Sequence, residues 1–421
     1  MSVPFKPADI LLPDFSTYNG TSWSCVACDQ YTSQPEYWES AHAIASDAPS
    51  TLRLIIPEVY LAETDARKPA VLATMDDYLR RVLVDHPATM ILVERTLGNG
   101  TTRWGLVGMV DLMTYDYRKG ADSLIRATEA TVTERIPART TIRRDAPVEL
   151  PHVMMLIDDR ACTVVEPLVA FKDTLTPAYD HDLMQKSGHL KGYFLTPALM
   201  EQVEGALAAL ITPEAMAERY GREDLAPLPF AVGDGNHSLA AAKTCFEEVR
   251  AALGDEVAMD HPARYALCEV VNLYDESLQF EPIYRVVFGV EPDHVLSSLE
   301  TYLATLQGDA APQELLWTSN GRAGVMTISH PVAALTVGTV QDFLDEYLKD
   351  APAGAYIDYI HGRNPAIALA NRPDAIAFLF DGMAKEELFS TVITDGALPR
   401  KTFSMGHAED KRFYTEVRRI K

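Results

Sequence analysis

The chain has 421 residues, of which 47% are apolar and 23% are charged, and it carries a formal net charge of −23. Its length predicts two or three lobes, because single hydrophobic cores stop growing at roughly 250–300 residues. The excess of acidic over basic residues argues against broad binding to nucleic acid or to anionic membranes, although it does not exclude a local basic pocket.

The N-terminus and the cysteines bear on the compartment. Residues 1–9 lack the basic and apolar regions of a signal peptide, and no segment is apolar for the length of a membrane span. Five cysteines scattered over the chain form no disulfide framework, which fits a reducing compartment. We therefore expect a cytoplasmic protein without a membrane partner.

Cys25 and Cys28 have the spacing of a metal or redox pair. No second Cys or His pair lies nearby in the sequence, as a structural zinc site would need. Buried strand cysteines are therefore the favoured interpretation of this pair.

Asp29 and Gln30 follow the apolar segment that holds these cysteines. They suit a substrate contact, and equally a turn closed by an Asx hydrogen bond. Residues 32–36 predict the cap of a helix that contains Tyr37.

Periodicity along the chain predicts helices and strands in alternation. Helical spacing occurs at residues 74–83, 132–144, 197–220, 292–306 and 338–349. Strand patterns occur at residues 90–112 (a hairpin with a Gly-Asn-Gly turn), 124–128, 153–166 (a second hairpin), 188–196, 264–274 and 280–288 (neighbouring strands), and 314–337 (a third hairpin). The order indicates an α+β fold with mixed sheets and helices, without internal repeats.

Residues 229–250 read as a strand, a tight turn and an Ala-rich helix. The turn carries Asp234, Asn236, His237 and Ser238 at the helix N-terminus. Because the first N–H groups of a helix have no internal partner, such a junction is suited to hold an anion.

Two further groups are candidates for the same site. Glu129 follows a strand pattern and lies between threonines, so it is either a site carboxylate or a solvated one. Arg400, Lys401, Thr402, Ser404 and His407 lie close together near the C-terminus, as an anion clamp or as a solvated basic loop.

Several common catalytic signatures are absent from the sequence. It has no phosphate-binding P-loop, no Gly-x-Gly-x-x-Gly, no kinase His-Arg-Asp set, no Gly-x-Ser-x-Gly elbow and no His-x-x-x-His pair. A P-loop, Rossmann, serine-hydrolase or zinc-hydrolase interpretation is therefore unsupported.

Residues 232–242, Val-Gly-Asp-Gly-Asn-His-Ser-Leu-Ala-Ala-Ala, resemble the Asp-Gly-His-His-Arg signature of the ParB/sulfiredoxin-like superfamily. The chain more closely resembles the domain-of-unknown-function 1015 family, through Thr128-Glu129, Glu281-Pro-Ile-Tyr-Arg285 and Pro399-Arg-Lys-Thr-Phe403. These matches are spread over most of the chain.

The resemblance implies a ParB-like α+β core in which this turn holds nucleotide phosphates, as in superfamily members that bind CTP, ATP or ADP. Asn236 and Ser238 stand where the signature has His and Arg. Loss of that Arg removes a bidentate phosphate clamp. Either Lys401 or Arg400 then supplies the charge, or the ligand differs.

The predicted function is a kinase-like phosphotransferase that uses ATP or ADP with Mg²⁺ on a small hydroxylated metabolite, for example an amino acid such as serine. The predicted catalytic residues are Asp234, His237 and Glu129, with Asp234 and Glu129 also as metal ligands. Phosphate contacts are expected from Gly233, Gly235, Asn236, Ser238, Arg400, Lys401 and Thr402. Substrate contacts are expected from Asp29, Gln30, Arg285, His361 and His407.

Two alternatives stay open: a non-catalytic nucleotide- or ligand-binding protein, and a metal-dependent phosphoester hydrolase. We expect residues 1–275 to form the ParB-like core with N-terminal elaborations. Residues 276–421 are expected to form a C-terminal α+β portion that closes over the site. The sequence leaves the oligomeric state open.

Overall fold

The computed structural model describes residues 3–129, 136–222 and 224–421, with the backbone alone for residues 136–138. The chain divides into two compact units: unit 1 is Met1–Leu278 with His407–Lys421, and unit 2 is Gln279–Gly406. The boundary expected after residue 275 falls near Leu278. Residues 407–421, expected in the C-terminal portion, lie in unit 1.

The large sheet of unit 1 has ten strands within the described residues, in the order β11-β12-β5-β6-β14-β10-β13-β8-β7, with β1 pairing to β6. β10 is parallel to β14, and β8 is parallel to β13 and β7. The strands are β1 (Phe5–Lys6), β5 (Ile91–Thr96), β6 (Thr102–Asp111), β7 (Tyr115–Asp116), β8 (Ile125–Ala127), β10 (Met154–Ile157), β11 (Thr176–Asp182), β12 (His189–Phe194), β13 (Phe230–Asp234) and β14 (Tyr265–Asn272). The predicted α+β class with mixed sheets is confirmed.

Both faces of this sheet are buried, because alternate side chains of a strand point to opposite sides. In β5, Leu92 belongs to one apolar cluster together with Phe246 of α8 (Asn236–Leu253). Its neighbours Ile91 and Val93 belong to another cluster together with Trp38 of α2 (Pro35–Ala45). Burial on both faces explains the nearly continuous apolar runs of these strands.

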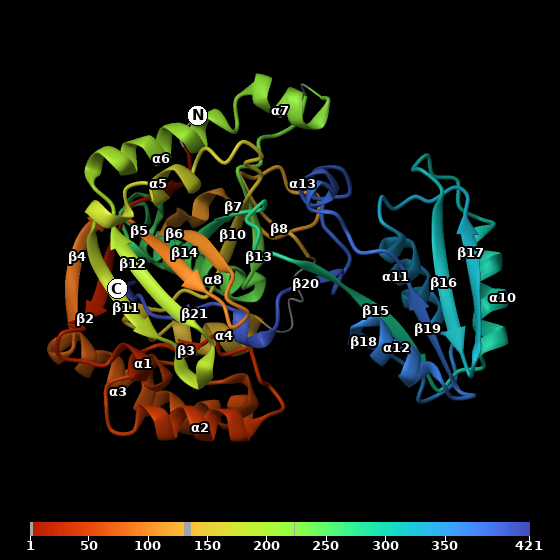
Figure 1. The fold of residues 1–421 in the computed structure, drawn as a ribbon, viewed down its shortest axis with the longest axis horizontal. Helices are drawn as coiled ribbons and strands as arrows, with labels where there is room; N and C mark the ends of the chain where they lie inside the picture. Colours follow the sequence, from red (N-terminus) through yellow and green to blue (C-terminus); the bar gives the residue numbers. More distant parts are fainter. Residues whose placement is uncertain (1–2, 130–135, 223) are drawn as a thin grey trace. The chain divides into compact units, whose positions relative to one another are not determined.

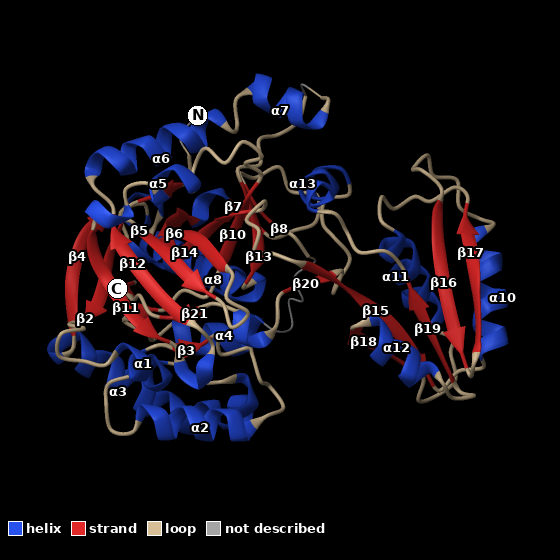
Figure 2. Ribbon diagram, in the orientation of Figure 1, coloured by secondary structure: helices blue, strands red, loops and turns tan. Residues whose placement is uncertain are grey.

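The helices of unit 1 cover the two sides of the sheet. In Figures 1 and 2, α5 and α6 lie on the opposite side of the sheet from α1, α2 and α3. The helices are α1 (Gly20–Trp23), α2 (Pro35–Ala45), α3 (Thr64–Arg81), α4 (Ile136–Arg143), α5 (Glu166–Val169), α6 (Pro197–Ala209), α7 (Pro213–Tyr220), α8 (Asn236–Leu253) and α9 (Asp255–Ala258).

Over the described part of unit 1, three small two-stranded sheets complete the fold, and two of them use the C-terminal segment. β2 (Ala8–Pro13) pairs with β4 (Leu83–Thr89), β3 (Cys25–Val26) with β21 (Phe413–Tyr414), and β9 (Val148–Glu149) with β22 (Arg418–Arg419). An isolated bridge joins Leu11 to Val417. The last residues of the chain therefore pair with strands that precede residue 150.

Unit 2 is a second α+β body. Its antiparallel sheet has the order β17-β16-β19-β15-β18, with β20 pairing to β15. The strands are β15 (Phe280–Phe288), β16 (Gln313–Ser319), β17 (Arg322–Ile328), β18 (Tyr356–His361), β19 (Ala375–Leu379) and β20 (Phe403–Met405). The helices are α10 (Pro292–Leu303), α11 (Thr336–Tyr347), α12 (Arg363–Ala370) and α13 (Lys385–Thr394).

The second predicted hairpin is wrong. β10 is a strand, but it pairs with β13 and β14 rather than with the residues that follow it. The Asp159 carboxylate instead accepts hydrogen bonds from the N–H groups of Thr163 at 2.6 Å and Val164 at 2.8 Å. These hydrogen bonds to the side chain bend the backbone toward α5, so the residues after β10 do not form the predicted second strand.

Two further local predictions are corrected. β14 and β15 are both strands, yet they lie in different units, because β6 and β10 flank β14 while β18, β19 and β20 pair with β15. Helix α2 begins at Pro35 after Gln34, with no side-chain hydrogen bond at its cap. Proline fits the first turn without an N–H group, so this start does not depend on a capping hydroxyl.

Over the ranges described, no helix has both the length and the apolar character needed to cross a membrane.

Candidate functional site

The predicted strand, turn and helix N-terminus are confirmed. β13 ends at Asp234, Gly235 has φ = 79°, and α8 begins at Asn236. A Cβ atom at Gly235 would lie 3.0 Å from the backbone Cα of Val153, so this position requires glycine for both conformation and space. The Asp234 carboxylate accepts a hydrogen bond from the Gly235 N–H at 2.8 Å and so helps to fix the turn.

Glu129 lies at the same end of a parallel strand pair as Asp234. Ala127 of β8 is opposite Val232 of β13, and Glu129 and Asp234 each follow two residues later. Thr128 Oγ1 donates a hydrogen bond to the Val232 carbonyl at 2.6 Å, which ties the two strand ends together. The two residues with the predicted carboxylates therefore lie at the same end of two neighbouring strands.

The cations beside this turn come from residues that the sequence did not single out. Arg139 of α4 donates from Nη1 to Ser238 Oγ at 2.8 Å. Lys411 Nζ lies 3.4 Å from Asp234 Oδ2. Both side chains are largely buried, at 17% and 15% exposed. Arg139 is 99 positions away from Ser238 in the chain, so no local pattern could have joined them.

Asp29 is brought into the same cluster. Its Oδ2 lies 3.6 Å from His152 Nε2 and 3.9 Å from Arg139 Nη2, and Arg139 also pairs with Glu58. Gln30 Nε2 donates to Asp29 Oδ1 at 2.9 Å. Burial by itself would raise the pKa of Asp29, but His152 and Arg139 outweigh it and hold the pKa of this carboxyl below its usual range.

A hydrogen-bonded chain connects Ser238 to Cys28. Ser238 Oγ lies 3.0 Å from His152 Nε2, and His152 Nδ1 lies 2.8 Å from the Tyr414 hydroxyl. Tyr414 in turn donates to Cys28 Sγ at 3.2 Å. His152 is only 5% exposed, and burial lowers the pKa of its imidazole, against the opposing pull of Asp29.

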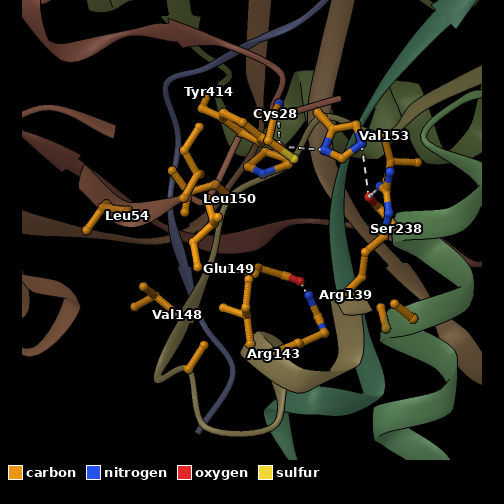
Figure 3. Close-up of a pocket in the computed structure, with 18 of the residues that line it drawn as sticks. Cys28, Leu54, Arg139, Arg143, Val148, Glu149, Leu150, Val153, Ser238 and Tyr414 are labelled. Atoms are coloured by element: carbon orange, nitrogen blue, oxygen red, sulfur yellow. Dashed lines mark hydrogen bonds and ion pairs between the residues drawn. The ribbon is translucent and has the colours of Figure 1, made fainter. Parts of the chain in front are cut away.

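Ser238 borders a cavity of about 160 Å³, which is smaller than the roughly 300–1,000 Å³ of typical small-molecule sites. In Figure 3, Arg139 reaches toward Ser238 at the start of α8, while Arg143 pairs with Glu149 at 2.5 Å. The remaining wall is mainly apolar and includes Leu54, Ile56, Met75, Val148, Leu150, Val153, Ala242 and Leu267. The cavity therefore has polar groups around Ser238 and at the Arg143–Glu149 pair, and the rest of its wall is mainly apolar.

The cysteine pair takes part in hydrogen bonds within the protein. Cys25 is buried in β3, and its Sγ accepts from Thr51 Oγ1 at 3.3 Å. Cys28 is half-buried and lines the cavity beside Tyr414. Within the residues that the structure covers, no three His, Cys, Asp or Glu side chains are grouped so that they could hold a metal ion.

Four predicted residues of the C-terminal loop lie in unit 2: Arg400, Lys401, Thr402 and Ser404. Arg400 Nε donates to the Tyr359 hydroxyl at 2.7 Å, and its guanidinium pairs with Asp345. Thr402 is buried and donates to the Pro399 carbonyl at 2.7 Å. Lys401 has φ = 54°, in a left-handed conformation. The contacts of Arg400 and Thr402 shape the loop, and a phosphate contact from any of these residues stays a prediction.

Arg285 is fully buried in unit 2, which corrects its placement among residues that face a substrate. Its guanidinium donates to the carbonyls of Arg400 at 2.6 Å and Lys401 at 2.8 Å. Arg285 therefore supports the loop from within. Of the two predicted histidines, His361 pairs with Glu281, while the His407 N–H donates to Asp410 at 3.1 Å in unit 1.

A model of the family described as "Protein of unknown function (DUF1015)" matches residues 12–347. The chain belongs to this family. The family resemblance that the sequence motifs indicated is therefore confirmed. No curated protein matches the sequence.

Several solved structures are similar to the chain at low identity. A conserved hypothetical protein from Pyrococcus furiosus is 11% identical, with a TM-score of 0.35, covering 74% of this chain and 94% of its own. A free serine kinase in complex with AMP is 10% identical, with a TM-score of 0.36, covering 73% and 90%. SbnI with a C-terminal truncation, from Staphylococcus aureus, is 10% identical, with a TM-score of 0.35, covering 71% and 82%.

Proposed function

We propose that the chain is a nucleotide-dependent phosphotransferase that acts on a small hydroxylated metabolite, for example an amino acid such as serine. The observation that supports this proposal is that two basic side chains lie beside the start of α8. Arg139 lies 2.8 Å from Ser238, and Lys411 lies 3.4 Å from Asp234. A helix N-terminus flanked by cations is a favourable setting for phosphate oxygens.

In this proposal, the turn holds the phosphates of ATP or ADP. Gly233, Gly235, Asn236 and Ser238 present the backbone, and Gly235 allows close approach because it has no side chain. Arg139 takes the role of the arginine that is missing from the signature, since its guanidinium reaches Ser238 from α4. The ion pair with Glu58 holds that guanidinium in one orientation.

Asp234, Glu129 and His237 are the proposed reacting groups. Asp234 accepts the proton of the attacking hydroxyl, or shares a magnesium ion with Glu129, and His237 acts at the reacting phosphate. Two carboxylates at neighbouring strand ends fit Mg²⁺, which is usually held by one or two carboxylates together with substrate phosphates. When bound, the ion neutralises charge that develops on the transferred group.

The acceptor is proposed to lie near Asp29 and Gln30. The Asp29 carboxylate is ionised beside His152 and Arg139, and it is suited to an ammonium or a hydroxyl group of a small metabolite.

Nucleotide binding and turnover test the proposal together. ATP, ADP and AMP would each be added with and without Mg²⁺, and thermal unfolding would be followed. A bound nucleotide at about 100 times its Kd stabilises the folded state by about 2.7 kcal/mol. The proposal is wrong if none of these nucleotides raises the temperature of thermal unfolding.

Asp234→Asn separates an enzyme from a binding protein. Asparagine keeps an oxygen that can accept from the Gly235 N–H, so the variant should lose no more than about 1 kcal/mol of stability, through the ion pair with Lys411. We expect phosphoryl transfer to fall by about 100-fold or more while nucleotide binding persists. A large loss of stability would indicate a purely structural turn. Release of inorganic phosphate without an acceptor would favour a hydrolase.

A further inference from the structure

The hydroxyl of Ser238 lies between a donor and a base. Arg139 Nη1 donates to Ser238 Oγ at 2.8 Å, and a guanidinium can only donate. The Ser238 hydroxyl proton is then available to His152 Nε2, which lies 3.0 Å from the same oxygen. The contact with Arg139 therefore leaves the serine proton available for donation to the histidine, which is the direction that activation of a nucleophile needs.

The other side of the imidazole is compatible with this assignment. With Nε2 as the acceptor, the neutral ring carries its proton on Nδ1, which donates to the Tyr414 oxygen at 2.8 Å. The Tyr414 hydroxyl passes its own proton to Cys28 Sγ at 3.2 Å. Every group in this chain then has a partner of the right kind, so the neutral tautomer with its proton on Nδ1 is compatible with all of these contacts.

A serine paired with an oriented histidine is the arrangement by which proteins activate a hydroxyl nucleophile. Ser238 is also reachable, because it is half-buried and forms part of the cavity wall in Figure 3. The positive charge of Arg139 at the same oxygen would stabilise negative charge that develops there. The apolar body of the cavity would keep water away from the reacting atoms.

We propose that Ser238 is a covalent nucleophile that carries the phosphoryl group between nucleotide and acceptor. This inference rests on the proposed function and specifies the order of its chemical steps. Ser238 Oγ bonds to the terminal phosphorus of ATP, the bond from that phosphorus to the bridging oxygen breaks, and ADP leaves. The serine proton passes to His152 Nε2. In the second half, the acceptor hydroxyl attacks the phosphoserine and gives its proton to Asp234, and Ser238 regains a proton from His152.

Two measurements without acceptor test this sequence. Intact-protein mass spectrometry after rapid quenching with ATP and Mg²⁺ should show the mass of one added phosphoryl group, mapped to the peptide that holds Ser238. Labelled ADP should also exchange into ATP, because the first half is reversible without acceptor. Ser238→Ala should abolish the adduct and lower the exchange by at least about 100-fold.

Matched variants separate this inference from simpler explanations. Thr244→Ala removes a hydroxyl from the same helix outside this cavity, and it should leave both signals unchanged. Tyr414→Phe keeps the ring but removes the oxygen that orients His152, so it should alter the pH profile of exchange more than nucleotide affinity. His152→Gln should abolish the adduct.

The outcomes also separate the two proposals. A nucleotide-induced thermal shift in Ser238→Ala, together with loss of exchange, supports both. A shift in the wild-type protein with neither adduct nor exchange overturns the covalent step alone and leaves direct transfer. Absence of any nucleotide shift overturns both. Full turnover by Ser238→Ala would likewise overturn the role of Ser238.

Discussion

Burial of His181 in unit 1 determines the charge state of its ring. His181 is 9% exposed, and Ser24 Oγ lies 3.0 Å from its Nε2. Burial, with a smaller contribution from His189, lowers the pKa of His181 from 6.5 to about 4, although Asp180 and Asp182 act in the opposite direction. The folded protein thus keeps this ring neutral at pH values where the unfolded chain would protonate it.

This difference predicts a stability change with pH. The contribution of His181 is fully present above about pH 6.5 and is lost as the pH falls toward about 4, because the unfolded state binds the proton first. The loss would be at most about 3 kcal/mol, from the roughly 1.4 kcal/mol that each pKa unit represents. Denaturant unfolding followed by tryptophan fluorescence, to which Trp23 and Trp38 of unit 1 contribute, measures it. His181→Gln should reduce the slope of stability against pH, and equal slopes for variant and wild type would contradict the prediction.

At the scale of elements, the junction of β13 and α8 holds the site together. The strand places Asp234 beside the end of β8, and the helix starts one residue after a glycine with positive φ. Without that conformation, the chain could not turn from strand into helix within a single residue. The geometry of the proposed anion site therefore depends on Gly235 as much as on the charged groups.

Replacement of two glycines tests this dependence. Gly235→Ala meets both an unfavourable φ and a Cβ contact at 3.0 Å with Val153 Cα, whereas Gly221→Ala at the end of α7, with φ = 70°, meets nothing within 4 Å. We expect Gly221→Ala to cost about 1 kcal/mol and Gly235→Ala about 1–3 kcal/mol more, with loss of nucleotide binding. Equal losses of stability in denaturant would show that the contact with Val153 is relieved by a small shift.

At the scale of the whole molecule, the C-terminal segment completes unit 1. Lys411 pairs with Asp234, Tyr414 lines the cavity, and residues 413–419 pair with strands from the first half of the chain. Arg412 is buried between Glu269 and Glu416, in a cluster of ionised groups shielded from water. The site is therefore assembled from both ends of the chain.

Arg412→Met tests how much unit 1 depends on this segment. Removal of the cation leaves two buried carboxylates without their partner, and we expect a loss of roughly 3–5 kcal/mol in unfolding free energy. Arg419→Met is the matched control, because Arg419 is 46% exposed and lies 3.6 Å from Asp85. It should cost less than about 1 kcal/mol. Similar losses for both variants in denaturant titrations would contradict the structural role of the segment.

Local signals in the sequence were sufficient for several elements. The hairpin of β5 and β6 follows from a Gly-Asn-Gly turn between apolar strands, and the turn at Gly235 follows from glycines between a strand and an Ala-rich helix. The prediction of a hairpin after β10 was wrong because the Asp159 side chain accepts hydrogen bonds from the backbone, which compete with strand pairing. Partners such as Arg139 could not be found, because contact between residues 99 positions apart leaves no periodic trace.

The sequence by itself determined the α+β class, the family and the position of the strand–turn–helix junction, because these depend on short-range patterns of glycine, apolar spacing and motif residues. Only the tertiary structure decided which side chains gather at that junction. Burial against the sheet brings α4 and the C-terminal segment to Ser238 and Asp234, and it places Arg285 inside unit 2. Charge placement in a site is set by packing between distant segments, which sequence periodicity does not encode.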